Sequence, residues 1–412
     1  MNIPRLTPTA AALLIFAAGG CTGHGRHTRD AMSAAELRMN QIRSATDWEM
    51  AESAFLAGDF DRAKEKLERS ISLNPGVAKT HELLGRVHLE RGDLAEARRS
   101  LLRASLLDPK LASAQYSLGI IGERLQDRED ALARYTAAAE LAPTDAVYAL
   151  AVVETFVDLD QLDEADRFLD DRARSFAYDA GVAQSRGHLS MLRGNTEEAV
   201  RAFHDARLLD PDQPELIEDL ARAQALAGQH AESAHNIESL LLRDEYTHRR
   251  DLRRQLARSY VELDRLGEAR STYLDIVADP TGAEDVSVWL ELGSLAHDMN
   301  DTNTLGRAGR RLMALATHQP EGYIYRAVYY RESGKAEQAS GVLEQAVERD
   351  SLNADGYVLL GLILADAGKR DEALSAFKAA ADSDPDHSLA SILSETVDEA
   401  SSLTTVTPED VD

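Results

Sequence analysis

The sequence has one cysteine, few aromatic residues and a shortage of bases, and each scarcity excludes a class of protein. One cysteine excludes a disulfide-stapled module and a cysteine-rich metal site. Aromatic residues make up 5% of the 412 residues, which disfavours a glycan groove built from exposed rings. With 45 basic against 71 acidic residues, the net charge of -26 argues against nucleic acid as a partner. The 44% apolar content in turn excludes a disordered chain.

The N-terminus has the layout of a secretory signal. Arg5 is followed by nine apolar residues, Ala10–Ala18, which are too few for the roughly 20 that a membrane-spanning helix needs. Gly19 and Gly20 then precede Cys21, the lone cysteine. We therefore expect a signal peptide over residues 1–20.

The segment ending at Cys21 resembles the lipobox of bacterial lipoproteins, although Ala18 stands where leucine is usual. The resemblance implies lipid attachment at Cys21, and Thr22 in place of an aspartate favours the outer membrane, with the body facing the periplasm. The alternative is cleavage by the ordinary signal peptidase, which would leave a soluble periplasmic protein. Residues 21–43 are expected to form a lipidated linker and a leading helix that starts at a capping box over Ser33–Glu36.

A period of 34 residues fills most of the remaining chain. Prolines 75, 109, 143 and 211 are separated by one, one and two multiples of 34, and small residues recur 24 and 12 positions before them. Ten units can be registered in this frame, starting at Ser44, Ala78, Ala112, Ala146, Ala180, Pro214, Arg250, Val286, Pro320 and Ala354. Small residues at the eighth and twentieth positions allow two helices to pack closely, and glycines recur where the first helix should end. No strand-like alternation occurs, so we expect an all-α protein.

These units resemble the tetratricopeptide repeat (TPR), a helix-turn-helix repeat of 34 residues. The resemblance implies a TPR solenoid, a right-handed superhelix of about ten repeats over residues 44–387. Residues 388–412 would form a capping helix and an acidic disordered tail. The unit from Val286 departs from the pattern at Leu305, Gly309 and Leu312, and two extra residues follow each of the sixth and seventh units. We expect these irregularities to bend or loosen the array.

In TPR proteins the first helix of each repeat lines a concave face that takes an extended peptide or a partner helix. The resemblance places the following partner-binding candidates on that face: Trp48, Phe55, Tyr116, Ile120, Met191, Leu192, Arg254, Arg258, Leu290, Ile324, Val328, Val358 and Leu362. Charged residues lie among them, including Glu82, Glu90, Arg86 and Arg222. The alternative is that several of the apolar residues pack between adjacent repeats. No unit has asparagine at its ninth position, so capture of a chaperone C-terminus through a carboxylate clamp is unsupported.

No catalytic or cofactor motif accompanies the repeats. A P-loop, a G-x-S-x-G elbow and H-E-x-x-H are all missing, and His24 and His27 lack a third metal ligand nearby. We therefore expect neither enzyme activity, nor a cofactor, nor a metal. The expected function is a membrane-anchored scaffold that binds proteins in envelope complex assembly, such as pilus secretin or outer-membrane assembly. The alternative is an accessory subunit of polysaccharide export or cell-wall machinery. If the acidic body attracts its partners electrostatically, those partners should be basic.

Overall fold

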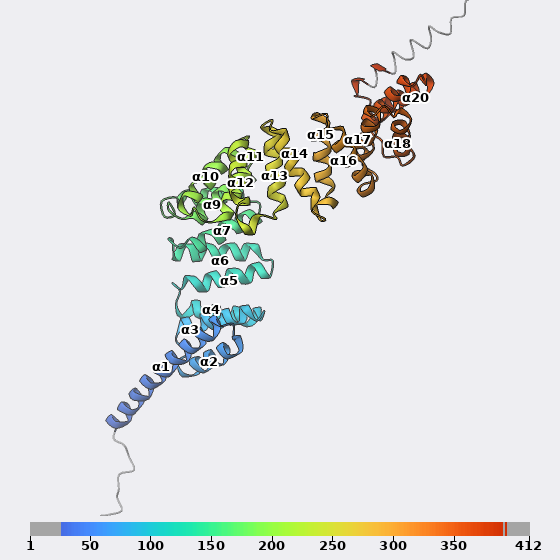
Figure 1. Ribbon diagram of the computed structural model, residues 1–412. Coiled ribbons are helices and arrows are strands. Elements are labelled where there is room, and N and C mark those ends of the chain that lie inside the picture. The colour runs from blue at the N-terminus through green and yellow to red at the C-terminus, as the bar shows by residue number, and fades with distance from the viewer. Residues whose placement is uncertain (1–25, 390–391, 394–412) are drawn as a thin grey trace, which may run out of the picture. The chain divides into compact units, whose positions relative to one another are not determined.

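The computed structural model describes residues 26–389 and 392–393, which form twenty α-helices, two short 3-10 helices and no strand (Figure 1). The chain divides into two compact units at residues 189 and 190. The helices of the first unit are α1 (Arg26–Leu56), α2 (Phe60–Leu73), α3 (Ala78–Glu90), α4 (Leu94–Leu107), α5 (Ala112–Arg124), α6 (Arg128–Leu141), α7 (Ala146–Asp158) and α8 (Leu162–Asp171). Helix α9 (Ala180–Leu192) contains the division.

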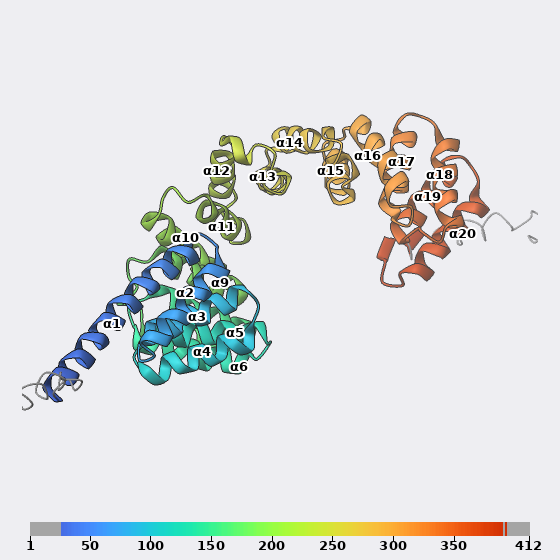
Figure 2. The same ribbon diagram turned by 90° about the horizontal axis from the view of Figure 1, so that it is seen from below.

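The second unit contains the remaining helices. They are α10 (Thr196–Leu209), α11 (Pro214–Leu226), α12 (His230–Leu241), α13 (Arg250–Glu262), α14 (Leu266–Ala278), α15 (Val286–Asp298), α16 (Thr302–Leu315), α17 (Pro320–Glu332), α18 (Ala336–Glu348), α19 (Ala354–Asp366) and α20 (Arg370–Ser383). The 3-10 helices η1 (Asp244–Tyr246) and η2 (Gly282–Glu284) lie between α12 and α13 and between α14 and α15. Within each unit, helices that follow one another in the chain pack side by side, as Figure 2 also shows.

The predicted register agrees with the helix boundaries. Nine of the ten predicted unit starts, from Ala78 to Ala354, are the first residues of the odd-numbered helices α3 to α19. The described chain is therefore all-α and consists of successive helix pairs, as predicted.

The start of the first pair was predicted wrongly. Helix α1 begins at Arg26 and runs without a break through Ser33 and Ser44 to Leu56. Ser33 therefore does not open a helix. The predicted leading helix and the first helix of the repeat from Ser44 are one element, α1. The apparent capping box lies inside a stretch whose alanine, leucine and methionine residues all favour helix, so there is nothing to stop the helix from extending upstream.

Small side chains in the second helix of each pair set the spacing between helices. Alanines at the twentieth position of eight units have no exposed surface: Ala63, Ala97, Ala131, Ala165, Ala199, Ala269, Ala339 and Ala373. Four positions later a large side chain is buried in most units, among them Tyr135, Phe203, Tyr273 and Phe377. The rings of Tyr135 and Phe377 lie against the small residue of the first helix, Gly119 and Gly361 respectively. A Cβ atom placed on Gly119 would be only 2.4 Å from Cε1 of Tyr135.

The turn within each pair requires a left-handed residue, as the sequence predicted. Glycines 58, 92, 194, 228, 334 and 368 all have φ between 72° and 79°. In the other four pairs the same turn uses Gln126, Asp160, Asp264 and Asn300, with φ between 53° and 61°. Asp350, with φ 52°, lies between α18 and α19 and so between two pairs. In this conformation the N–H of the left-handed residue and that of the next residue both bond back to the helix, as when Gly58 N donates to Phe55 O over 3.0 Å and Asp59 N to Ala54 O over 2.9 Å.

The irregular unit from Val286 is tightly packed and not loosened. A Cβ atom on Gly309 of α16 would lie 2.6 Å from the backbone nitrogen of Arg326 in α17, so the two helix backbones are in direct contact there. Gly322 of α17 likewise lies against α16. Gly309 stands where an aromatic residue is usual, so α16 and α17 approach closely, and Leu305 and Leu312, which stand where alanine is usual, are both buried.

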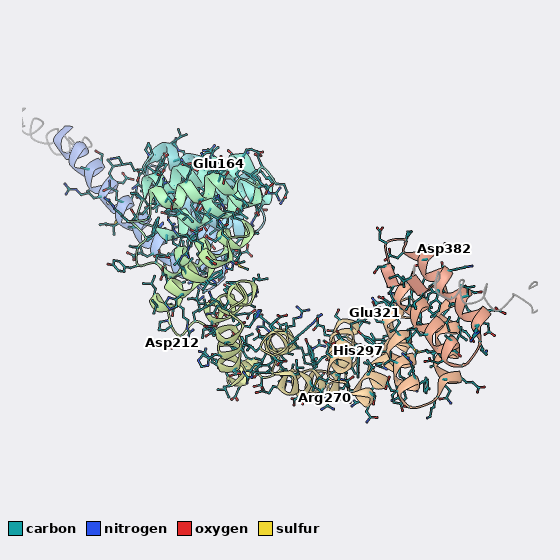
Figure 3. The ribbon with its side chains drawn as sticks, turned by 90° about the horizontal axis from the view of Figure 1, so that it is seen from above. Glu164, Asp212, Arg270, His297, Glu321 and Asp382 are labelled. Carbon is teal, nitrogen blue, oxygen red and sulfur yellow. The ribbon has the colours of Figure 1, made fainter. Side chains whose placement is uncertain are left out.

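The two-residue insertions are also held in place. The second insertion forms η2, whose Ala283 carbonyl accepts hydrogen bonds from Trp289 Nε1 at 2.9 Å and from Arg311 Nε at 3.0 Å. Neighbouring pairs are joined by polar links as well. Arg270 of α14, labelled in Figure 3, donates to Asp301 and Thr304 at the start of α16.

Several predictions fall on residues that the structure does not describe. These are the signal peptide over residues 1–20, lipid attachment at Cys21, the linker before Arg26 and the acidic tail over 394–412. Among the described residues, no helix is both long enough and apolar enough to cross a membrane.

Candidate functional site

Each of the two compact units has a cleft lined mainly by the first helices of successive pairs. In the first unit a groove of about 390 Å³ is lined by residues of α1, α3, α5 and α7. We call it the aromatic groove, and its main side chains are Phe55, Glu82, Arg86, Tyr116, Ile120 and Tyr148. In the second unit a cleft of about 820 Å³ is lined by α11, α13, α15 and the first residue of α12. We call it the arginine cleft, after Arg222, Arg249, Arg250, Arg254 and Arg258.

Rings form one wall of the aromatic groove. The rings of Tyr116 and Tyr148 are 5.1 Å apart between centroids and tilted by 44°. Tyr116 also packs 5.3 Å from the buried ring of Tyr135 behind it. The guanidinium of Arg86 lies over the face of Phe55, 4.8 Å from its centroid. The groove thus already holds one cation against an aromatic face, an arrangement that the ring quadrupole favours.

A buried carboxylate lies in the same groove. Glu82 is 8% exposed, and its Oε1 atom has no hydrogen-bond partner among the residues that the structure describes. The nearest base is Arg86, whose Nη1 is 3.7 Å from Oε1. Burial raises the pKa of Glu82, and this effect outweighs Arg86, Ser113 and Lys79, which lower it. The carboxylate is therefore incompletely compensated.

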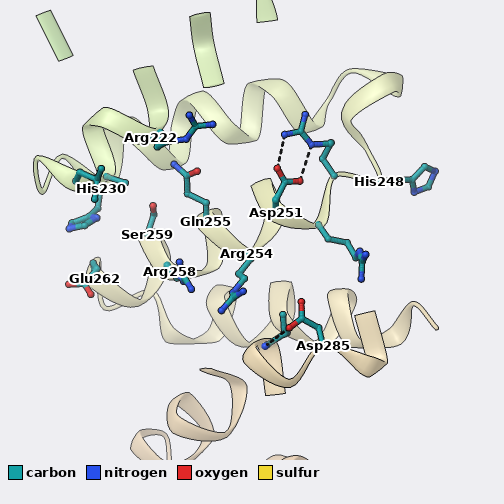
Figure 4. Close-up of a pocket in the computed structure, with 15 residues that line it drawn as sticks. Arg222, His230, His248, Asp251, Arg254, Gln255, Arg258, Ser259, Glu262 and Asp285 are labelled. Atoms are coloured by element: carbon teal, nitrogen blue, oxygen red, sulfur yellow. Dashed lines mark hydrogen bonds and ion pairs between the residues drawn. The ribbon is translucent and has the colours of Figure 1, made fainter. Parts of the chain in front are cut away.

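Helix α13 supplies the central side chains of the arginine cleft. Arg250, Arg254 and Arg258 are spaced by four residues, which places them on one side of that helix. In Figure 4, Arg254 and Arg258 extend from α13 toward the helix that Asp285 precedes. Gln255, His230 and His248 also line the space.

Carboxylates hold the cleft arginines in position. Glu291 of α15 accepts from Arg254 Nε at 3.0 Å and from Arg258 Nε at 3.1 Å. Burial would raise the pKa of Glu291, but the bonds from these two arginines outweigh it and lower that pKa. Arg249 donates to Asp251 at 2.9 Å, as drawn in Figure 4, and to Glu218 at 3.0 Å. The cleft therefore offers ordered N–H donors whose positive charge is largely neutralised.

The two clefts contain five of the thirteen predicted partner-binding residues. Phe55, Tyr116 and Ile120 meet in the aromatic groove, and Arg254 and Arg258 meet in the arginine cleft. The others do not line either cleft. Five of them are partly buried and pack on core residues: Trp48, Met191, Leu290, Ile324 and Leu362.

The last three predicted residues differ in exposure. Leu192 is 58% exposed and Val328 is partly buried. Val358 is 6% exposed and packs against Ala380, so it belongs to the core and has almost no surface to offer a ligand. Its position in the repeat is one of those predicted for the inner face, but Ala380 of α20 and Leu393 pack in the same cluster and bury it.

Sequence reasoning missed several lining residues. Val147 and Tyr148 lie at the second and third positions of α7, Arg249 directly precedes α13, and Arg250 is the first residue of α13. The repeat pattern follows positions along each helix and gives no information on side chains that reach in from the start of a neighbouring pair. Within the described part of the chain, no group of three or more histidine, cysteine or acidic residues could hold a metal ion.

The fold and its clefts define an all-α repeat protein with inward-facing first helices. Residues 54–118 and residues 326–388 each match a family model of the tetratricopeptide repeat. The protein is a TPR protein, and its fold is an all-α TPR solenoid. TPR proteins are generally non-catalytic, and the fold suggests a scaffold that binds proteins or peptides.

Solved structures with similar folds share little sequence identity with this chain. MamA is 20% identical, with 42% of this chain and 94% of that chain covered and a TM-score of 0.36. A TPR protein from Parabacteroides merdae is 18% identical, with coverage of 60% and 97% and a TM-score of 0.40. PilW, a type IV pilus biogenesis factor, is 15% identical, with coverage of 49% and 94% and a TM-score of 0.43. No curated protein sequence matches the chain.

Proposed function

We propose that this protein is a non-enzymatic, membrane-anchored TPR scaffold that binds protein partners during the assembly of bacterial envelope complexes, such as a pilus secretin or outer-membrane proteins. One observation carries the binding role. Both clefts open on the faces made by first helices, and both combine partly exposed apolar side chains with ordered charged groups. Such a combination suits an extended segment, because apolar contacts supply affinity and charges fix the register.

The anchor and the compartment rest on the sequence. The apolar run Ala10–Ala18 followed by Cys21 supports lipid attachment at that cysteine and a position at the outer membrane, facing the periplasm. Several acyl chains on one residue would hold the protein firmly, since a single chain gives only marginal membrane binding.

Site-specific photo-crosslinking in cells tests the binding role. Val147 in the aromatic groove is 54% exposed and Leu226 in the arginine cleft is 63% exposed, so each can be replaced by a photo-crosslinking amino acid without disturbing the core. Leu106 and Leu208, on the second helices α4 and α10, are 74% and 68% exposed and serve as matched controls. We expect defined partner proteins to be crosslinked from Val147 or Leu226 and not from the controls. Identical crosslinks from all four positions would reject binding through these clefts.

Metabolic labelling tests the anchor separately. Wild-type protein should incorporate radiolabelled palmitate and fractionate with membranes, and Cys21→Ser should do neither. Unlabelled wild-type protein would reject the lipid anchor and leave the soluble periplasmic form, with the binding role unaffected.

A further inference from the structure

We propose that the aromatic groove binds a lysine or arginine side chain of an extended partner segment beside Glu82. This inference rests on the proposed scaffold function and names the chemistry of one of its partners. Charge indicates a cationic occupant, because the residues that line the groove include the acids Glu82, Glu90 and Asp145 and one base, Arg86.

The unpaired oxygen of Glu82 points to a ligand. A buried carboxylate oxygen without a hydrogen-bond donor is costly, and a native structure that keeps one calls for an explanation, such as an unseen partner. Oε1 of Glu82 has no hydrogen-bond partner within residues 26–389 and 392–393, and Arg86 stays at 3.7 Å, beyond hydrogen-bond length. A cationic donor from a partner would supply the missing hydrogen bond and charge.

The aromatic wall suits a cation more than a neutral apolar side chain. Tyr116 and Tyr148 face the same groove, and a guanidinium or ammonium group resting on such rings is attracted by their π faces. Arg86, already placed over Phe55, shows that a guanidinium fits this environment. Because the side chain of Arg86 is about half exposed, it can move aside for a ligand.

The arginine cleft is the weaker candidate for a charge-selected partner. Its five arginines are balanced by five carboxylates, Asp251, Glu262 and Asp285 in the lining and Glu218 and Glu291 bonded to the arginines, so the charge available to an acidic segment is small. The aromatic groove has the opposite property, because its acidic side chains outnumber its base.

A pooled peptide selection tests the inference. Full-length wild-type protein is immobilised and exposed to acetylated, amidated nonapeptides with random flanks and a central arginine, lysine, citrulline or norleucine. We expect the wild type to enrich arginine and lysine over citrulline and norleucine. Glu82→Gln keeps the shape but removes the charge, and it should weaken binding of the enriched peptides by about tenfold or more. Glu140→Gln, the same change on the exposed surface of α6, should leave binding unchanged.

A second variant controls for the possibility that Glu82→Gln does not fold. Tyr148→Leu removes one ring of the wall and should reduce the preference for the cationic peptides by about two- to fivefold. Circular dichroism confirms that each variant is folded, and Tyr148→Leu decides the question if Glu82→Gln is not. A wild type without arginine or lysine enrichment, or an enrichment that survives both changes, overturns the inference. The scaffold function fails only if the crosslinking experiment also yields no groove-specific partner.

Discussion

At the scale of single residues, the spacing of two helix pairs depends on a glycine that faces a large ring. Gly119 faces the buried ring of Tyr135, and Gly361 faces that of Phe377, with hypothetical Cβ atoms 2.4 Å from ring carbon Cε1 in both cases. Neither ring can move easily, because Tyr135 and Phe377 are almost completely buried. A glycine here is therefore a packing requirement and not a source of flexibility.

Gly119→Ala is expected to destabilise the first unit by about 1 to 3 kcal/mol, because the added methyl group overlaps the ring of Tyr135. Gly341→Ala is the matched control, since a Cβ at that position in α18 meets nothing within 4 Å. The control should gain about 0.5 to 1 kcal/mol from the better helix propensity of alanine. Urea unfolding of both variants measures the difference, and equal shifts for the two would contradict the packing argument.

At the scale of elements, the helix starts differ in how well they are capped. Asp301 precedes α16 and accepts hydrogen bonds from Thr304 N at 3.1 Å and Thr304 Oγ1 at 2.6 Å. Asn195 holds the same place before α10, but its side chain makes no capping hydrogen bond. Burial would raise the pKa of Asp301, but the bonds from Thr304 and Arg270 outweigh it and lower that pKa.

Asp301→Ala should lower the free energy of unfolding by about 1 to 2 kcal/mol at neutral pH, and Asn195→Ala should lower it less. Because the pKa of Asp301 is lower in the folded state, its contribution is complete above its unfolded value of 3.8. The contribution is lost as the pH falls through the folded pKa. Thermal unfolding between pH 7 and pH 3 should therefore show the stabilities of the wild type and Asp301→Ala converging at the acidic end. A difference that is constant across this range would show that the charge of Asp301 is not involved.

At the scale of the whole molecule, stacked pairs make stability a local property. In repeat proteins each pair contacts only its neighbours, so damage in one pair does not unfold distant ones. The core here consists of separate clusters along the chain, such as the cluster around Tyr135 and Val152 and the cluster around Leu343 and Phe377.

Gly361→Leu should therefore damage α19 and α20 and their neighbours α17 and α18, because it wedges against Phe377. Hydrogen exchange followed by mass spectrometry should show faster exchange in these helices. Helices α3 to α6 should keep their wild-type protection. Loss of protection in both units together would mean that the chain unfolds as one cooperative body.

The sequence predicted the helices well because the repeat uses local rules. Ala78, Pro214 and Val286 start helices as predicted, since each follows a turn that ends the preceding helix. The start of α1 could not be placed, because helix-favouring residues continue upstream of Ser33 without any stop. The packing of the repeat from Val286 was predicted wrongly. Gly309 of α16 and Gly322 of α17 let these two helix backbones approach closely, and a pattern along one helix does not show such a contact.

The sequence by itself determined the repeat register, the all-α class and the inner-facing positions, because periodicity and small-residue spacing depend on helix geometry alone. Only the tertiary structure decided which of those positions form a cleft. It brought Phe55, Tyr116 and Ile120 together, buried Val358, and left Glu82 without a hydrogen bond for its Oε1 atom. The physical reason is that a cleft depends on how far side chains from successive pairs reach across the face, and that distance is set by the packing of several helices at once.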